Sequence, residues 1–443
     1  MSEVALVVGM GRSGVAVARH LHDRGARVVA VDDAPGDAAR IAAARLGIDL
    51  VEAPDPARLR ALVEGADVVV PSPGVPLAHP VFTEAVERGV PVRGEVELAF
   101  RWSRHPVVAV TGTNGKTTVT ALITGMLTSS GIRAVAGGNI GLPLSDAVRR
   151  DVDVVVAEVS SFQLWWTDTF RPAVAVWLNL AQDHLDWHPE VADYAAAKAR
   201  IWAHQADGDL AVANADDPVV AGYAASAPAR VERFGTAETA DWRVVDGMLS
   251  GPPGPVMAVS ELPRALPHDV ANALAASAAA AAAGATPDGM RAALLGWAAL
   301  PHRMTLVAEE AGVRWYDDSK ATNPHATLAA LSGFRSVVLI SGGRNKGLDL
   351  GVLAGGAAAV RAVVAIGEAG PEVAAAFDGV RPVTVVDSMD EAVAVAAAAA
   401  RPGDAVLLSP GCASFDHYRS YAERGDDFAR AVARLLEGGA SGG

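Results

Sequence analysis

The stretch Val107–Thr118, which reads VVAVTGTNGKTT, decides the fold of this chain. The apolar run from Val107 to Val110 predicts a buried strand, and a helix is expected from Thr118 through Ser129. A glycine-rich turn ending in Lys116 joins the two. A strand, a glycine turn and a helix in this order are typical of a loop that holds the phosphates of a nucleotide triphosphate.

The chemistry of such a loop depends on its backbone and on two side chains. Backbone N–H groups of the turn and of the helix N-terminus point at phosphate oxygens. Lys116 is expected to reach the β- and γ-phosphates, and the Thr117 hydroxyl is expected to hold Mg²⁺. The general pattern has a glycine at position 110, where this chain has Val110, so the loop is a variant. The alternative is an ordinary strand–turn–helix with an exposed lysine.

Composition narrows the class of protein. The chain has 443 residues, enough for two or three domains, and a formal net charge of −14, which argues against a nucleic-acid partner. Its one cysteine, Cys412, excludes internal disulfides and fits a reducing compartment. No secretory signal pattern follows Met1, and the apolar stretch Ala271–Ala285 is mostly alanine. We therefore expect a cytoplasmic protein without a membrane span.

Short Val, Leu and Ile runs alternate with helical segments, which is typical of parallel sheets with crossover helices. The expected strands are Val4–Val8, Val28–Val31, Val68–Val70, Val107–Val110, Val154–Ala157, Val174–Leu178, Val337–Ile340, Val363–Ile366 and Ala405–Leu408. Breaks before the phosphate loop and after residue 299 divide the chain into three α/β domains. We place these domains at residues 1–94, 95–300 and 301–443.

The first domain opens with a second glycine turn, GMGRSG at residues 9–14, and Asp32 and Asp33 stand at the end of the next expected strand. Alone, this pattern is a dinucleotide fingerprint and would suggest a dehydrogenase. It is also compatible with a turn needed only for tight packing, or with binding of another diphosphate such as a UDP-sugar. The triphosphate loop favours the diphosphate interpretation. Ser72 and Gly74, after a third expected strand, form another candidate phosphate turn.

Polar side chains follow the strands of the middle domain. Glu158 ends the strand after the phosphate loop, where an acid can take Mg²⁺. Asp183 and His184 follow the next strand, and His184 is either a metal ligand or an ordinary loop histidine. Fourteen residues further on, Lys198 has the spacing of a helix-surface lysine.

Three expected strands of the last domain are followed by polar loops. These loops are Asp317–Pro324, Gly342–Gly347 and Ser409–Asp416. Open α/β sheets bind ligands beyond the carboxyl ends of their strands. Any one of these loops alone is compatible with a plain connection, but the three together predict a binding site.

At this point the chain resembles the Mur ligases over nearly its whole length, and among them the D-glutamate-adding branch. The loop Thr111–Thr118 is similar to the ATP loop of that superfamily, which folylpolyglutamate synthetases share. Narrower matches to the D-glutamate-adding branch are Glu158–Leu164, Asp318–Asn323 and Ser409–Asp416. The resemblance implies a Rossmann-like N-terminal domain that binds a UDP substrate, a central P-loop-type ATPase domain with a mainly parallel sheet, and a Rossmann-like C-terminal domain that binds the amino acid.

The resemblance also implies roles for individual residues. The ATP contacts are Gly112, Thr113, Asn114, Gly115, Lys116, Thr117, Thr118, Asn272, Arg303, Asp318 and Lys320. One Mg²⁺ would lie on Thr117 and Glu158, and a second on His184 and a CO₂-derived carbamate of Lys198. The UDP substrate would contact Arg12, Ser13, Asp32, Asp33, Ser72, Gly74 and Asn139. D-glutamate would contact Thr322, Lys346, Ser414, Phe415 and Tyr421, the last of these a position where some relatives carry Phe.

The implied reaction is ATP-dependent, ADP-forming addition of D-glutamate to UDP-N-acetylmuramoyl-L-alanine through an acyl phosphate. Lys116, Asn139, His184, Lys198 and Lys320 would be its catalytic residues, and the enzyme is expected to act as a monomer on small molecules. Two alternatives stay open. One is another amide ligase of the superfamily, which adds a different amino acid or glutamyl units to folate. The other is a nicotinamide-dependent oxidoreductase, suggested by the first glycine turn.

Overall fold

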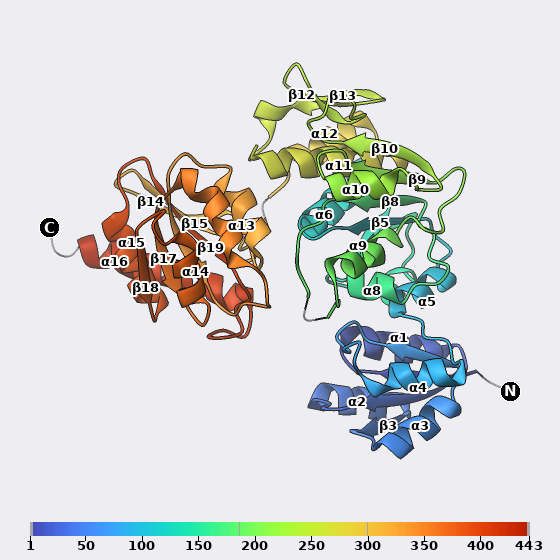
Figure 1. The fold of residues 1–443 in the computed structure, drawn as a ribbon. Coiled ribbons are helices and arrows are strands. Elements are labelled where there is room, and N and C mark those ends of the chain that lie inside the picture. The colour runs from blue at the N-terminus through green and yellow to red at the C-terminus, as the bar shows by residue number, and fades with distance from the viewer. Residues whose placement is uncertain (1–2, 186, 299, 441–443) are drawn as a thin grey trace. The chain divides into compact units, whose positions relative to one another are not determined.

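The protein is an α/β chain with three large sheets and one small one (Figure 1). Its structure, a computed structural model, describes residues 3–185, 187–298 and 300–440. Two compact units can be distinguished. The first contains residues 3–180, 187–262 and 270–296, and the second contains 181–185, 263–269 and 297–440 except residue 299. Each unit is described by itself.

The N-terminal part of the first unit holds a parallel sheet in the order β3-β2-β1-β4. Its strands are β1 (Val4–Val8), β2 (Arg27–Asp32), β3 (Asp49–Glu52) and β4 (Val68–Pro71), and its helices are α1 (Arg12–Asp23), α2 (Asp37–Leu46), α3 (Pro56–Glu64) and α4 (Pro80–Arg88). Alternate residues of β1 pack in two separate hydrophobic clusters. Ala5 and Val7 belong to one cluster, and Leu6 and Val8 belong to the other. Both faces of the sheet are therefore covered, as continuous apolar strands require.

The larger sheet of the first unit is also parallel, in the order β10-β9-β8-β5-β7-β6. Its strands are β5 (Val107–Thr111), β6 (Ala134–Gly138), β7 (Val154–Glu158), β8 (Val174–Trp177), β9 (Leu210–Asn214) and β10 (Arg230–Phe234). The helices of this region are α5 (Glu95–Trp102), α6 (Lys116–Ser129), α7 (Leu144–Ala147), α8 (Ser161–Trp165), α9 (Val191–Ala199), α10 (Pro218–Ala224), α11 (Pro267–Ala282) and α12 (Pro287–Leu295). A small antiparallel sheet consists of β11 (Arg243–Val245), β12 (Met248–Gly251) and β13 (Gly254–Ala258), and a short 3₁₀ helix, η1 (Val259–Glu261), follows it.

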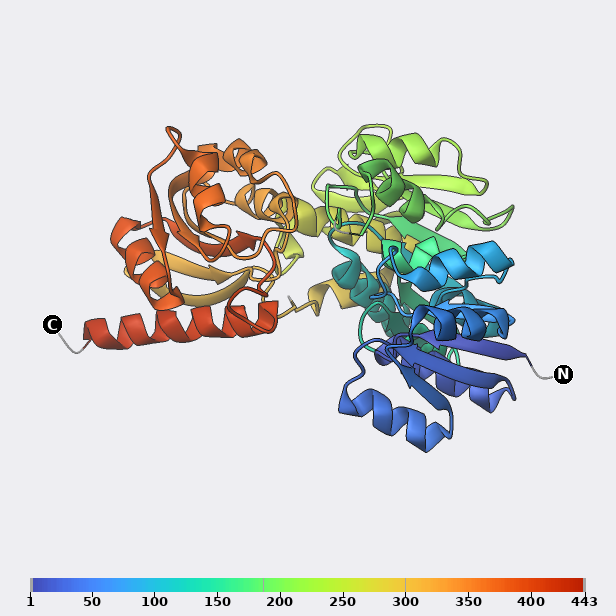
Figure 2. The same cartoon turned by 60° about the horizontal axis from the view of Figure 1, so that its bottom comes forward.

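The second unit is built on a six-stranded sheet in the order β14-β15-β19-β16-β17-β18, parallel except for β14. Its strands are β14 (Thr305–Glu310), β15 (Val313–Asp317), β16 (Val337–Gly342), β17 (Val360–Ile366), β18 (Val383–Val386) and β19 (Ala405–Gly411). Its helices are α13 (Pro324–Leu331), η2 (Leu350–Ala359), α14 (Gly370–Phe377), α15 (Met389–Ala399) and α16 (Tyr421–Ala440), and Figure 2 shows the long α16 in red along one side of this unit. Val337 and Leu339 pack in one cluster and Val338 and Ile340 in the other, so this sheet is also buried on both faces.

The predicted fold class is confirmed, and so are all nine predicted strands. The missed strands include β14, which mixes polar with apolar residues, whereas the apolar run Leu210–Ala213 of β9 was present in the sequence and was overlooked. The domain boundaries at 94/95 and 300/301 stay a prediction. Among the described residues, no helix is long and apolar enough to cross a membrane.

Candidate functional site

The phosphate loop leaves the carboxyl end of β5 in the middle of the large sheet of the first unit. Gly115 has φ +85°, and a Cβ there would lie 2.6 Å from Oδ1 of Asn272. A side chain at 115 would therefore meet both backbone strain and a close neighbour. Asn272, a predicted nucleotide contact on α11, stands directly against the loop.

Asn179, which follows β8, holds the loop from the side. Its Oδ1 accepts from the Asn114 N–H at 2.9 Å, and its Nδ2 donates to the Asn114 carbonyl at 3.2 Å. Its own carbonyl accepts from the Thr113 N–H at 3.1 Å. Because β8 and β5 are neighbours in the sheet, an amide at the end of one strand fixes the loop after the other.

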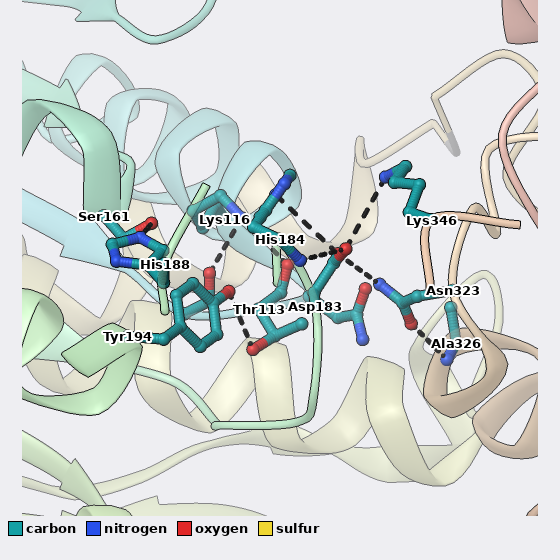
Figure 3. Close-up of polar contacts among 12 residues, drawn as sticks. Thr113, Lys116, Ser161, Asp183, His184, His188, Tyr194, Asn323, Ala326 and Lys346 are labelled. Carbon is teal, nitrogen blue, oxygen red and sulfur yellow. Dashed lines mark hydrogen bonds and ion pairs between the residues drawn. The ribbon is translucent and has the colours of Figure 1, made fainter. Parts of the chain in front are cut away.

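The Lys116 ammonium lies inside the loop. Nζ donates to the Gly112 carbonyl at 2.8 Å and to the Thr113 carbonyl at 2.9 Å, the second of these contacts being visible in Figure 3. A lysine folded back on its own loop occupies the concave side of the turn, where phosphate oxygens are the natural partners of an ammonium.

Glu158 ends β7, next to β5, and is 1% exposed. Its Oε1 accepts from Asn139 Nδ2 at 2.8 Å, while its buried Oε2 has no hydrogen-bond partner. A buried carboxylate oxygen without a donor is costly unless a cation completes it. The residues present therefore fit Mg²⁺ at Glu158, beside the loop that carries Thr117.

Lys198 is buried, 1% exposed, on α9. Its Nζ donates to the Gly112 carbonyl at 2.9 Å and lies 4.5 Å from the centre of the Tyr194 ring. The Tyr194 hydroxyl in turn contacts Thr113 Oγ1 at 3.2 Å (Figure 3). The helix-surface interpretation of Lys198 is therefore wrong: the side chain points at the phosphate loop.

His184 lies in the second unit, so its assignment to the same ion as Lys198 stays a prediction. In the described part of the chain, no three His, Cys, Asp or Glu side chains form a ready metal cluster.

The predicted UDP-substrate residues of the N-terminal sheet come together. Arg12, Ser13, Asp32, Asp33, Ser72 and Gly74 all line one cavity of about 540 Å³. The Asp32 carboxylate accepts from the Met10 N–H at 2.7 Å. Asn139, the seventh predicted contact, is exposed at the end of β6, and the neighbouring Gly141 carbonyl accepts a hydrogen bond from Arg12.

In the second unit, the three predicted loops leave the adjacent strands β15, β19 and β16. Asp318 is buried, and its Oδ2 accepts from Ser409 Oγ at 2.9 Å. Burial raises the pKa of Asp318 to about 7, although Ser409 and Arg303 act in the opposite direction. Lys320 Nζ lies 5.0 Å from the centre of the Tyr421 ring.

Asp183 is the hub of a second cluster in this unit (Figure 3). One carboxylate oxygen accepts from Asn323 Nδ2 at 3.0 Å, and the other lies 3.5 Å from Lys346 Nζ. His184 Nε2 is 3.7 Å from Asp183 Oδ2. Burial opposes ionisation of Asp183, but His184, Lys346 and Asn323 outweigh it and lower its pKa.

The other predicted residues of this unit differ in exposure. Ser414 is buried, Thr322 is half-buried, and the Phe415 side chain is 62% exposed. The Arg303 carbonyl accepts from Arg264 Nη1 at 2.9 Å. His302 and Met304, on either side of Arg303, both have positive φ, so this segment is held in a strained conformation.

Several residues of the site were missed at the sequence level. They are His79, Asn179, Asp183, Tyr194, Asn323 and Arg424. His79 lines the cavity and lies 3.2 Å from Asp33.

One signal in the sequence could have weighed against a surface role for Lys198. Only four of the 37 lysine and arginine residues are lysines, and they are Lys116, Lys198, Lys320 and Lys346. A chain that uses arginine everywhere else keeps lysine where the chemistry of an amine matters.

Comparison with known proteins decides the family. The Mur ligase middle domain matches residues 110–280, the glutamate ligase domain of Mur ligases matches 302–412, and the MurD-like N-terminal domain matches 3–94. The chain belongs to the Mur ligase family. This membership and the triphosphate loop favour an amide ligase over the oxidoreductase alternative.

Similar Mur ligases are found in several bacteria. The UDP-N-acetylmuramoylalanine–D-glutamate ligase of Frankia casuarinae is 48% identical over 98% of this chain and 94% of its own length. The enzyme of the same name from Pelotomaculum thermopropionicum is 43% identical over 98% of both chains. Solved structures share the fold: MurF of Acinetobacter baumannii has a TM-score of 0.64 at 19% identity, covering 98% of this chain and 91% of that one. A pseudomurein peptide ligase type C of Methanothermus fervidus has a TM-score of 0.62 at 18% identity, covering 98% and 100%.

Proposed function

We propose that this Mur ligase joins D-glutamate to UDP-N-acetylmuramoyl-L-alanine at the expense of ATP, a step in peptidoglycan-precursor synthesis. One observation carries the phosphoryl-transfer half of the proposal: Lys116 lies in a phosphate loop beside Glu158, whose buried Oε2 lacks a partner. The substrate half is supported by near-full-length relatives that are named for this reaction.

In the first step, the terminal carboxylate of the UDP substrate attacks the γ-phosphorus of ATP. The bond between this phosphorus and the oxygen of the β-phosphate breaks, and ADP leaves. Two anions must approach each other, so the Lys116 ammonium stabilises the charge that builds up on the transferred group. Thr117 and Glu158 would hold a Mg²⁺ ion, which supplies further neutralisation of the phosphate charge.

In the second step, the D-glutamate amine attacks the acyl carbon, inorganic phosphate leaves, and the nitrogen loses a proton. Lys346, Thr322 and Ser414 are the proposed donors to the two carboxylates of D-glutamate. Lys346 lies 3.5 Å from the buried Asp183, which keeps the ammonium in place while leaving its other hydrogens available. Phe415 and Tyr421 are the proposed apolar walls, Lys320 touches an ATP phosphate, and Asn272, Arg303 and Asp318 contact the nucleotide.

We also propose a carbamate on Lys198 that, with His184, would hold a second Mg²⁺. A neutral amine adds CO₂ and loses a proton, which replaces a cation by an anion with two oxygens. We also propose three domains with boundaries at 94/95 and 300/301, and a monomer that works in the cytoplasm, where the buried Cys412 stays reduced.

An ADP-release assay tests this function. ADP and phosphate should form only when the UDP substrate and D-glutamate are both present, and L-glutamate, other amino acids and folates should give background rates. Equal turnover with L-glutamate would contradict the stereochemical part. Turnover with another amino acid would instead support the alternative of a different amide ligase of this family.

A further inference from the structure

Arg424 is the most completely buried arginine of the described chain, 2% exposed in the first turn of α16. Its Nε donates to Ser319 Oγ and its Nη2 to the Ser319 carbonyl, both at 2.9 Å. Nη2 also reaches the Cys412 carbonyl at 3.1 Å, and Nη1 reaches the Ala413 carbonyl at 3.2 Å. A longer contact of 3.5 Å joins Nη1 to the Gly342 carbonyl. The guanidinium is thus surrounded by carbonyl and hydroxyl oxygens.

These partners belong to three different loops. Ser319 follows β15, Gly342 ends β16, and Cys412 and Ala413 follow β19, which lies between those two strands. One planar group therefore binds the ends of three neighbouring strands at once. Each loop carries a predicted ligand contact next to its bond with Arg424: Lys320 and Thr322 in the first, Lys346 in the second and Ser414 in the third.

The backbone leaves room for this guanidinium. Gly343 has φ +128°, and a Cβ there would lie 2.9 Å from Arg424 Nη1 and 2.3 Å from the Ala413 carbonyl oxygen. A side chain at 343 would therefore clash both with the arginine and with the loop after β19.

The energetics favour a fixed arrangement of these loops. A buried guanidinium is stable only while its N–H groups are paired, so moving one loop would leave donors without partners. Burial lowers the pKa of Arg424 to about 10, and the group stays charged at neutral pH. Lysine carries the same charge but lacks the planar fork that reaches three loops together.

We propose that Arg424 is a positioning residue of the amino-acid site, setting the spacing of the three loops that carry Thr322, Lys346 and Ser414. The inference rests on the proposed function for the identity of the ligand. It goes beyond that function because Arg424 itself need not touch the substrate.

The test compares Arg424→Lys with a matched control, Arg361→Lys. Arg361 lies in the same unit, near the start of β17, and pairs with Asp404, which directly precedes β19. This pair lies at the amino ends of the parallel strands, whereas the loops bound by Arg424 lie at their carboxyl ends. We expect Arg424→Lys to raise the KM for D-glutamate about tenfold or more, as the loss of charge-assisted hydrogen bonds predicts, with the KM for the UDP substrate unchanged. Arg361→Lys should leave both KM values at the parental level. A parental KM for D-glutamate in Arg424→Lys overturns the inference.

Hydrogen exchange of the unliganded protein provides a readout that does not need catalysis. Arg424→Lys should speed exchange together in residues 318–323, 342–347 and 409–416, whereas Arg361→Lys should not. Unchanged protection in these loops overturns the positioning role even if the parent enzyme is active. A parent without D-glutamate turnover overturns the proposed function, while the exchange result still decides whether Arg424 organises the loops.

Arg424→Gln, which keeps a planar but neutral amide, covers the case in which Arg424→Lys does not fold. Loss of cooperative thermal unfolding in both variants overturns the inference, because Arg424 would then stabilise the whole unit and would not act on one site alone.

Discussion

The phosphate loop of the first unit and the three-loop edge of the second unit are built in opposite ways. The loop at 111–118 is continuous, and its backbone is held by the conformation of its glycines and by Asn179. The edge at β15, β19 and β16 brings together segments that lie from about 20 to about 100 residues apart in the sequence. Buried charged side chains, Arg424 and Asp183, join these segments. A site made from the backbone depends on local conformation, whereas a site made from buried charges depends on every partner remaining in place.

The largest effect should come from Lys116, the one long side chain that the continuous loop requires. Lys116→Ala removes a fixed cation from the group where charge develops, and kcat should fall by about 10²–10³. Steady-state ADP release measures this change. Arg133→Ala, an exposed cation before β6 that pairs with Asp151 and Asp153, is the control and should keep parental turnover. A Lys116→Ala variant within about threefold of the parent would mean that the backbone alone makes this site.

Lys198 tests this difference between the two sites, because its buried side chain contacts the phosphate loop, which otherwise depends on its backbone. If Lys198 acts as a carbamate, Lys198→Arg keeps the positive charge but cannot form this group, and turnover should fall about 10². Lys198→Ala leaves space that acetate can fill, so added acetate should restore part of the activity. Full turnover of Lys198→Arg at saturating Mg²⁺ would exclude the carbamate.

Asp318 tests the buried charges of the second site through pH. Burial raises its pKa to about 7, so the carboxylate is mostly ionised at pH 8 and mostly protonated at pH 6. If the ionised form accepts hydrogen bonds from the nucleotide, the KM for ATP should rise up to about tenfold between pH 8 and pH 6. Asp318→Asn should have a higher KM at pH 8 and little pH dependence from this group. The same slope in the parent and in Asp318→Asn would assign the titration to another group, such as the ATP itself.

The smallest effect on catalysis is expected at the far end of the same sheet. Burial opposes ionisation of Asp404, but Arg361, Ser336 and the Arg401 N–H outweigh it and lower its pKa to about 2. A depressed carboxyl pKa contributes stability that is present above its ordinary value of 3.8 and is lost as pH falls through about 2. Asp404→Asn should therefore lower the free energy of unfolding at pH 7 by about 1–2 kcal/mol, with turnover unchanged. Denaturant titration at pH 7 and pH 3 checks this, and a stability loss that is larger at pH 3 would contradict it.

The two sites also differ in how far the sequence predicts them. The phosphate loop, its strand and its helix were predicted from a dozen consecutive residues, because the turn between the strand and the helix requires glycine at fixed positions. The three loops of the second unit were predicted as a polar strand edge, since parallel strands bring their carboxyl ends together. Arg424 was not predicted, because it lies in an amphipathic helix where arginine is common, and only the fold shows its side chain buried.

Lys198 shows that helical spacing can also suggest a surface position for a residue that the fold buries. Its position in a helical segment with alanine neighbours gives no sign of burial, and only the family resemblance predicted a site role. The fold explains the difference: α9 turns this side chain toward the Gly112 carbonyl, a contact between residues 86 positions apart.

The scarcity of lysine has a practical consequence for protein chemistry. The chain offers only four side-chain amines, at positions 116, 198, 320 and 346, and all four are predicted site residues. A lysine-specific protease or an amine-acylating reagent therefore probes the sites and almost nothing else, apart from the α-amino group. Mass spectrometry of the resulting few large peptides, with and without each substrate, would give a footprint of Lys116, Lys320 and Lys346, whereas Lys198, 1% exposed, is protected by the fold itself.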